Sequence, residues 1–183
     1  MSTKIVLTYE DYLALPNDGK RYEIMRGDLY VSPSPVPRHQ IILSRVFDAL
    51  REYARAHSWG VILPAPLDVL LSQTNIVEPD IIGIAAARKG IIAEKNIEGT
   101  PDFLVEIISE STRRNDKVLK LKLYAEFGVK EYWIVDPVID TVEIFSPAEV
   151  GLTRIAEVTA GTADSRLLAG FSIDVAQLFS RDL

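Results

Sequence analysis

The chain has 183 residues, 48% of them apolar and 25% charged, so it is long enough for one domain with a substantial core. It contains no cysteine and only two histidines, which excludes disulfides, thiolate metal centres and a cysteine nucleophile, and disfavours a histidine-rich zinc site. With 20 basic and 26 acidic side chains, its formal charge of −6 argues against a whole-surface contact with DNA or an anionic membrane.

The sequence shows no segment that would place the chain in or across a membrane. No stretch approaches the roughly 20 apolar residues that span a bilayer, and residues 1–7 contain no signal-peptide core. Internal repeats, low-complexity tracts and linkers are also absent from the sequence. We therefore expect a single cytoplasmic domain over residues 1–183, with no membrane partner.

The first third of the chain predicts a short helix, a hairpin and a long helix. A helix N-cap pattern beginning at Thr8 predicts a helix over residues 9–15. Residues 21–25 and 28–32 flank a glycine-containing turn and predict a β-hairpin. After a stiff proline-rich connection, apolar residues recur at helical spacing over 38–57 and predict the longest helix.

The rest of the chain predicts mainly strands, with a second helix among them. Short β-type runs lie at residues 61–63, 67–71, 81–85 and 103–109. A helix over 115–127 follows, then strands at 131–136, 141–146 and 154–158 and a last short helix at 174–179. Strands in the middle, with one long helix before and one after, indicate an α/β domain with a mixed sheet flanked by helices.

Two carboxylates interrupt this apolar pattern. Asp80 follows Pro79 and opens an apolar run, and Glu106 lies inside an almost wholly apolar strand. A lone carboxylate in a buried strand costs several kcal/mol unless it is paired or binds a cation. Taken alone, Asp80 could be a strand-start cap and Glu106 the partner of an arginine. Together they favour one site, where two neighbouring strands could hold a hard divalent ion through oxygen ligands.

A basic helix follows Glu106 in the sequence. Lys120 lies four residues after Asp116 and four before Tyr124, so these three share a helix face. A lysine near a carboxylate-held metal can position the attacking water or offset developing negative charge. For Lys117 and Lys122 the alternative, an ordinary solvated helix face, is preferred.

Other polar and aromatic residues have structural interpretations that we prefer to functional ones. His39, at the start of the long helix, is interpreted as a surface residue, with a phosphate or water contact as the alternative. Tyr132 and Trp133 fit a core or dimer contact better than base stacking. Without a histidine base, Ser109 fits orientation of Glu106 or a turn cap better than a nucleophile.

The order of the motifs resembles that of a known family. The segments are Arg21-Tyr22-Glu23, residues 33–39, Glu78-Pro79-Asp80, Val105-Glu106-Ile107-Ile108-Ser109, Asp116…Lys120…Tyr124 and Gly128-Val129-Lys130-Glu131-Tyr132-Trp133-Ile134-Val135-Asp136-Pro137. From about Thr8 to Phe145 the chain resembles the Uma-type putative restriction endonuclease family of the PD-(D/E)XK nuclease superfamily.

The resemblance implies a restriction endonuclease-like fold with a metal-dependent phosphodiesterase site, on a mixed sheet of four or five strands. It implies that Asp80 and Glu106 bind Mg²⁺ or Mn²⁺, that the Ile107 carbonyl completes the shell, and that Glu23 binds directly or through water. The superfamily lysine two residues after the second acid is replaced here by Ile108, and the resemblance transfers its role to Lys120.

These observations leave three functions to compare. The first is a magnesium-dependent DNA endonuclease acting as a homodimer, with the apolar face around residues 132–135 as its contact. The alternative is a catalytically weak module on the same fold that binds nucleic acid or a protein partner. A hydrolase of small phosphate substrates ranks last, because the sequence has no phosphate-cradling glycine loop.

Overall fold

A computed structural model of the chain describes residues 5–110 and 112–182, and residues 1–4, 111 and 183 lie outside this description. Its centre is a six-stranded sheet in the order β11-β10-β9-β8-β6-β3. The strands are β3 (Gly60–Pro64), β6 (Ile81–Ala85), β8 (Phe103–Ile107), β9 (Glu131–Asp136), β10 (Thr141–Pro147) and β11 (Leu152–Val158). Strands β8 and β9 are parallel and the other neighbours antiparallel, so the sheet is mixed, as predicted, but has six strands rather than four or five.

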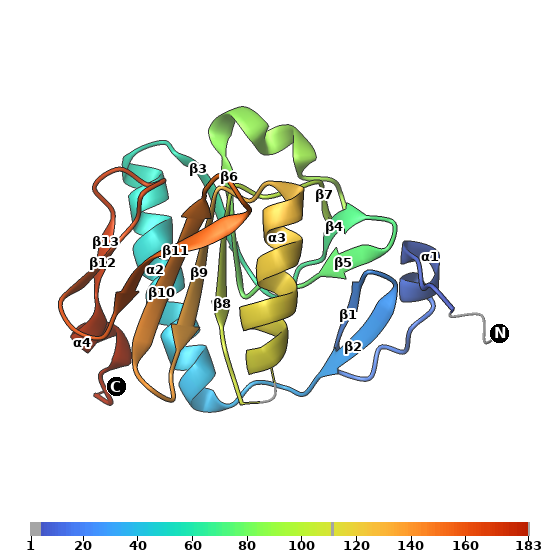
Figure 1. Ribbon diagram of the computed structural model, residues 1–183, viewed down its shortest axis with the longest axis horizontal. Coiled ribbons are helices and arrows are strands. Elements are labelled where there is room, and N and C mark those ends of the chain that lie inside the picture. The colour runs from blue at the N-terminus through green and yellow to red at the C-terminus, as the bar shows by residue number, and fades with distance from the viewer. Residues whose placement is uncertain (1–4, 111, 183) are drawn as a thin grey trace.

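A second sheet carries the predicted hairpin. Its order is β2-β1-β5-β4-β7, with the parallel pair β4 and β7 at one end. The strands are β1 (Arg21–Met25), β2 (Asp28–Ser32), β4 (Val69–Ser72), β5 (Asn75–Val77) and β7 (Ile97–Glu98). The hairpin and helix α1 (Tyr9–Leu13) lie on the side of the molecule away from the C-terminal strands (Figure 1).

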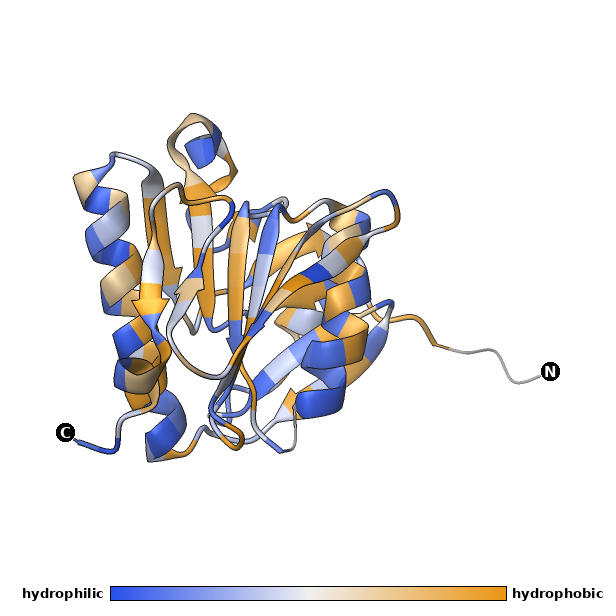
Figure 2. Cartoon of the chain, turned by 60° about the vertical axis from the view of Figure 1, so that its left-hand side comes forward, coloured by the Kyte–Doolittle hydropathy of each residue, from blue (hydrophilic) through white to orange (hydrophobic). Residues whose placement is uncertain are grey.

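Two helical segments cover opposite faces of the central sheet (Figure 1). Helix α2 (Pro37–Ala56) packs on one face, and the continuous segment of η2 (Asn115–Lys120, a π-helical turn) and α3 (Leu121–Phe127) packs on the other. The central strands are largely hydrophobic, whereas the helices alternate between hydrophobic and hydrophilic residues (Figure 2). This pattern follows from a sheet buried on both faces and helices buried on one.

Strand β8 shows how the two faces are divided. Val105 and Ile107 join the apolar cluster under α2, whereas Leu104 and Ile108 join the cluster under α3. Because side chains alternate along a strand, Glu106 points to the α3 face. This alternation decides which helix can reach its carboxylate.

The C-terminal segment contains two short strands that the sequence pattern did not predict. Strands β12 (Thr162–Asp164) and β13 (Ser172–Asp174) form a small sheet, and elements of three residues carry no readable periodicity. Helix α4 (Val175–Phe179) follows them where the sequence predicted a helix over 174–179. A 3₁₀ helix, η1 (Ala86–Ile91), follows β6 and was also not predicted. No described helix is both long and apolar enough to cross a bilayer.

The predicted dimer contact at residues 132–135 is wrong. All four side chains are 0% exposed, because β9 lies inside the sheet, where helical segments and the C-terminal elements cover both of its faces. The core interpretation of Tyr132 and Trp133 is confirmed.

Two further carboxylates are structural. Glu131 accepts hydrogen bonds from the Trp133 indole at 2.7 Å, the Ser165 hydroxyl at 2.6 Å and the backbone amides of Arg166 and Leu167, both at 2.8 Å. It therefore fastens the C-terminal loop to β9.

Asp102 is the second structural carboxylate and is 1% exposed. It contacts the Lys130 amine at 2.7 Å, and the Ala85 amide and the Arg88 guanidinium at 2.9 Å each. Burial alone raises the pKa of Asp102, but these partners outweigh burial and hold the pKa below its ordinary value. Asp102 therefore stabilises the fold by joining three separate segments.

Candidate active site

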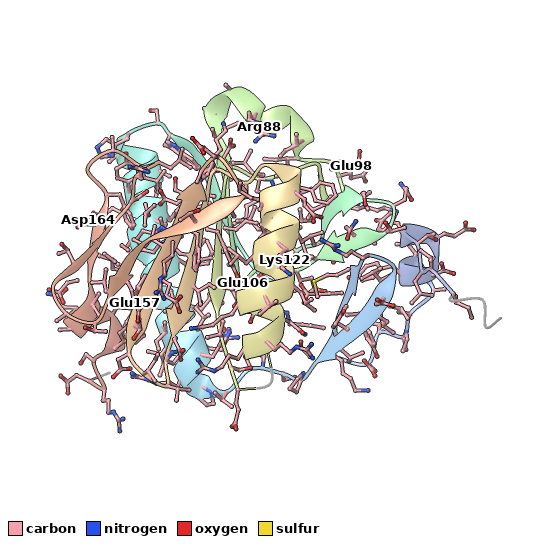
Figure 3. All side chains as sticks on the ribbon, viewed as in Figure 1. Arg88, Glu98, Glu106, Lys122, Glu157 and Asp164 are labelled. Atoms are coloured by element: carbon pink, nitrogen blue, oxygen red, sulfur yellow. The ribbon has the colours of Figure 1, made fainter. Side chains whose placement is uncertain are left out.

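Four separate elements bring the residues singled out by the sequence to one cavity of about 120 Å³. Glu23 comes from β1, Asp80 directly precedes β6, Glu106 lies on β8 and Lys120 ends η2. Ile107 also lines the cavity. Figure 3 shows Glu106 between the central sheet and α3, the helix that carries the exposed Lys122.

Lys120 is the centre of a buried ion-pair cluster. Its side chain is 3% exposed, and its Nζ lies 2.8 Å from Glu23 Oε1, 2.8 Å from Glu106 Oε1 and 3.4 Å from Asp116 Oδ1. Ile108, two residues after Glu106, is buried in the apolar cluster instead. The amine thus reaches Glu106 from the helix, as the sequence analysis expected.

The charges of this cluster set the protonation of its members. Burial alone lowers the pKa of Lys120, but the carboxylates of Glu106 and Glu23 hold it well above its ordinary value. The Lys120 amine therefore favours its charged form. Burial, offset in part by Lys120, raises the pKa of Glu106 well above its ordinary value, and the charges of Asp116 and Asp80 raise it further.

Asp80 is held from three directions. Its Oδ1 accepts a hydrogen bond from Arg21 Nη1 at 2.9 Å, and its Oδ2 accepts one from the Ile107 backbone amide at 2.8 Å. His39 Nε2 lies 3.3 Å from the same Oδ2. Burial raises the pKa of Asp80, but His39 and Arg21 outweigh it, so this pKa lies below its ordinary value.

The prediction of a surface position for His39 is wrong, since the residue is only 6% exposed. The first turn of α2 lies over the cavity, so this turn presents His39 to Asp80.

The sequence did not predict that Arg21 contacts Asp80 or that Tyr124 contacts Glu106. Arg21 lies two residues before Glu23, so their side chains share one face of β1. This spacing was the sequence signal that could have placed Arg21 near Glu23. Tyr124 donates a hydrogen bond from its hydroxyl to Glu106 Oε1 at 2.8 Å. Its position on the same helix face as Lys120 was the corresponding signal.

Oxygen atoms remain available around the cavity for a cation. A carboxylate offers about four acceptor positions. Lys120 and Tyr124 both contact the Oε1 atom of Glu106. Lys120 and the Glu78 amide both contact the Oε1 atom of Glu23. The Oε2 atoms of Glu106 and Glu23 therefore accept no hydrogen bond from the described residues. Asp80 Oδ1 keeps one further position beside Arg21.

The charge balance of the cavity also favours a cation. The charged residues that line it are Glu23, Asp80, Glu106, Asp116, Arg21 and Lys120. With each side chain counted in its ordinary ionised form, four acids minus two bases leave a formal excess of two negative charges. Within residues 5–110 and 112–182, no group of three or more acidic or histidine side chains forms a ready-made metal centre. A hard ion that keeps several of its waters needs only one or two protein carboxylates, so the donor set fits such an ion.

Comparison with known proteins gives a family and a fold. A family model described as Uma2, putative restriction endonuclease, matches residues 9–176. Among solved structures, a putative nuclease belonging to DUF820 from Anabaena variabilis is similar, with a TM-score of 0.77 and 19% sequence identity over 94% of this chain and 97% of that one. No curated protein sequence matches. The structural likeness confirms the predicted nuclease-like α/β fold.

Proposed function

Because the chain belongs to the Uma2 family of putative restriction endonucleases, we propose that it is an endonuclease that hydrolyses DNA phosphodiester bonds with a divalent ion. The observation that carries the proposal is the meeting of Glu23, Asp80 and Glu106, from distant parts of the chain, at one cavity. A buried lysine at this cavity contacts two of the three, Glu23 and Glu106. Burying several like charges is costly, so their convergence needs a compensating function.

The proposed ligands are the carboxylates of Asp80 and Glu106, with the Ile107 carbonyl and Glu23 completing the shell. Mg²⁺ or Mn²⁺ fits these hard oxygen donors, and the chain has no thiolate to offer. When bound, such an ion supplies Lewis acidity that lowers the pKa of water and offsets charge on a phosphate.

The chain's own groups provide orientation and charge. Tyr124 and Lys120 fix the Glu106 carboxylate by two hydrogen bonds to one oxygen. Arg21 and the Ile107 amide fix Asp80 by one hydrogen bond to each of its two oxygens. The Lys120 ammonium supplies the positive charge that favours a pentavalent phosphate in this cavity.

A second function is favoured by one specific observation. Arg21 and Lys120 already neutralise part of the carboxylate cluster, so the fold satisfies much of the site with its own cations. This arrangement supports a catalytically weak module on the same fold that binds nucleic acid or a protein partner.

Nicking of supercoiled plasmid separates the two functions. Wild-type protein with Mn²⁺ should nick the plasmid, whereas Glu106→Gln and Asp80→Asn should lose at least about 100-fold in rate. Glu157→Gln, an exposed glutamate on β11 (Figure 3), is the matched control and should nick like wild type. An absence of nicking on single-stranded, duplex and supercoiled DNA, with no Mn²⁺ binding by calorimetry, would refute the endonuclease and leave the binding module.

A homodimer belongs to the same proposal, because two sites are needed to cut both strands of a duplex at once. Residues 132–135 are buried and cannot form its interface. Sedimentation equilibrium of the wild-type protein tests this, and a monomer at micromolar concentration would refute it.

A further inference from the structure

The cavity of the candidate active site lies between two larger hollows. The first hollow, of about 720 Å³, shares Arg21 and Asp80 with the wall of the cavity. The second hollow, of about 560 Å³, shares His39 and Ser109 with it. The two hollows have no described lining residue in common, so the cavity separates them. We call the first hollow, the cavity and the second hollow together the track.

The middle of the track is narrow and its acidic groups are buried. The cavity has a volume of about 120 Å³, and Asp80 and Glu106 are each 2% exposed. Duplex DNA is a stiff rod whose bases are stacked and paired inside it. A backbone that brings a phosphate to these carboxylates must therefore leave the regular helix. An enzyme that acts on a duplex in this way has to unstack and unpair nucleotides, whereas a single strand needs no unpairing.

The first hollow offers aromatic side chains to a base. Tyr12 and Tyr22 line it and are both half-buried. The Tyr12 hydroxyl donates a hydrogen bond to Asp68 Oδ1 at 2.7 Å, which holds the ring in place on the wall. Aromatic side chains bind single strands because every base can stack on them, whatever the sequence.

The second hollow offers an apolar surface. Val36 and Val138 line it and are 61% and 69% exposed, and Pro137 lies beside them. Exposed large apolar side chains that gather beside a candidate active site indicate a contact surface. Apolar side chains of this kind also contact unstacked bases in proteins that distort DNA.

Each hollow also carries a cation that a phosphate can reach. The Lys20 side chain, 55% exposed, lines the first hollow and pairs with Asp18 at 2.7 Å. The Arg38 side chain, 29% exposed, lines the second hollow and contacts Asp140 at 3.3 Å. Ion pairs at the surface contribute little stability, so a phosphate can take the place of either carboxylate at small cost.

We propose that the track binds a single-stranded segment of DNA, with the phosphate to be cut at the cavity and an unstacked base in the hollow on each side. The cleavage of this strand rests on the proposed nuclease function, and the inference adds the substrate class. Negative supercoiling favours local strand separation, so nicking of supercoiled plasmid remains expected.

The first experiment compares the binding of a labelled single strand of 12 nucleotides with that of a blunt duplex of the same sequence. Fluorescence anisotropy in EDTA and in Ca²⁺ should give at least about tenfold tighter binding of the single strand. Tyr22→Ala should weaken this binding about 5- to 150-fold, the range for the loss of one stacked base. Thermal unfolding verifies that each variant is folded.

A matched pair of substitutions tests the second hollow. Val138→Glu places a negative charge beside the strand and should weaken binding about fivefold. Val150→Glu makes the same change at a valine that is 88% exposed, in the turn between β10 and β11 and outside the track. It should bind the single strand like wild type.

Cleavage of the same two DNAs in Mn²⁺ separates this inference from the proposed function. The single strand should be cut at least about tenfold faster than the blunt duplex. Equal cleavage of the two DNAs overturns the inference and leaves the nuclease, as does wild-type binding of the single strand by both Tyr22→Ala and Val138→Glu. Single-strand binding that these two variants weaken, with no cleavage in Mn²⁺ or Mg²⁺, refutes the nuclease alone and supports the track.

Discussion

Replacing Lys120 by methionine is the most direct test of the buried cluster. Methionine keeps the length and the apolar stem of the side chain but removes the ammonium. The change leaves three carboxylates, Glu23, Glu106 and Asp116, without the cation that all of them contact. Lys122, two residues along and exposed, provides the matched control as Lys122→Met.

The magnitude follows from the contacts. At an effective dielectric of about 20, each contact of 2.8 Å corresponds to about 6 kcal/mol of gross attraction. Desolvation of the buried charges cancels most of this, and removing one partner of a buried pair costs about 3–5 kcal/mol. For a domain of this size, that loss lowers the melting temperature by about 6–20 °C, whereas Lys122→Met should stay within about 0.5 kcal/mol of wild type.

The assay combines chemical unfolding in EDTA, unfolding in Mn²⁺ and plasmid nicking. In EDTA, Lys120→Met should be destabilised by the amount above. Mn²⁺ should stabilise this variant more than wild type, because the ion replaces the missing positive charge, yet nicking should be lost. Equal stability of the Lys120 and Lys122 variants in EDTA would refute the charge argument. Wild-type nicking by Lys120→Met would refute the catalytic part.

Three further substitutions test the scaffold. Glu131→Gln should lower the free energy of unfolding in urea by about 3 kcal/mol, because the NH2 group that replaces one carboxylate oxygen cannot accept the two hydrogen bonds which that oxygen receives. Exposed Glu149→Gln should change little. The pKa of Asp102 is lower in the folded protein than in the unfolded chain. The Asp102 carboxylate therefore contributes its full stabilisation of the fold above the unfolded-state pKa of about 3.9, and this contribution is lost as the pH falls through the folded-state pKa. The stability gap between wild type and Asp102→Asn, measured by urea unfolding, should therefore be wide at pH 7 and narrow below about pH 4; a gap independent of pH would contradict this. Gly83→Ala places a methyl group 2.9 Å from Phe103 Cβ and should cost about 1–3 kcal/mol, and a thermal shift of zero would contradict the close approach of these strands.

Local patterns gave reliable predictions where one segment decides its own conformation. The helix over residues 38–57 and the strand over 131–136 have clear periodicity and apolar runs, and the structure contains them within a residue or two. The predicted strand at 67–71 begins two residues later, and β5 and β7 were missed, since elements of two or three residues are defined by their partners alone.

The candidate site was predictable to the extent that its residues break the apolar pattern. Glu106 inside an apolar strand and Asp80 at the start of another drew attention because isolated buried charge is costly. His39 and Arg21 break no pattern, since a polar residue in the first turn of a helix or at the start of a hairpin is ordinary. Their contacts with Asp80 depend on the packing of α2 and β1, which no local pattern contains.

The sequence by itself determined the α/β class, the absence of thiolate ligands and which acidic residues interrupt the apolar pattern, because composition and periodicity are properties of the chain alone. The tertiary structure decided the sixth strand of the central sheet, the burial of residues 132–135 and the contacts of Lys120. Glu23 and Lys120 lie almost a hundred residues apart in the sequence, yet their charged atoms lie 2.8 Å apart. Only the tertiary packing of the helical segment and the hairpin brings such residues together, and the same packing gathers the acidic residues that we propose as ligands of a cation.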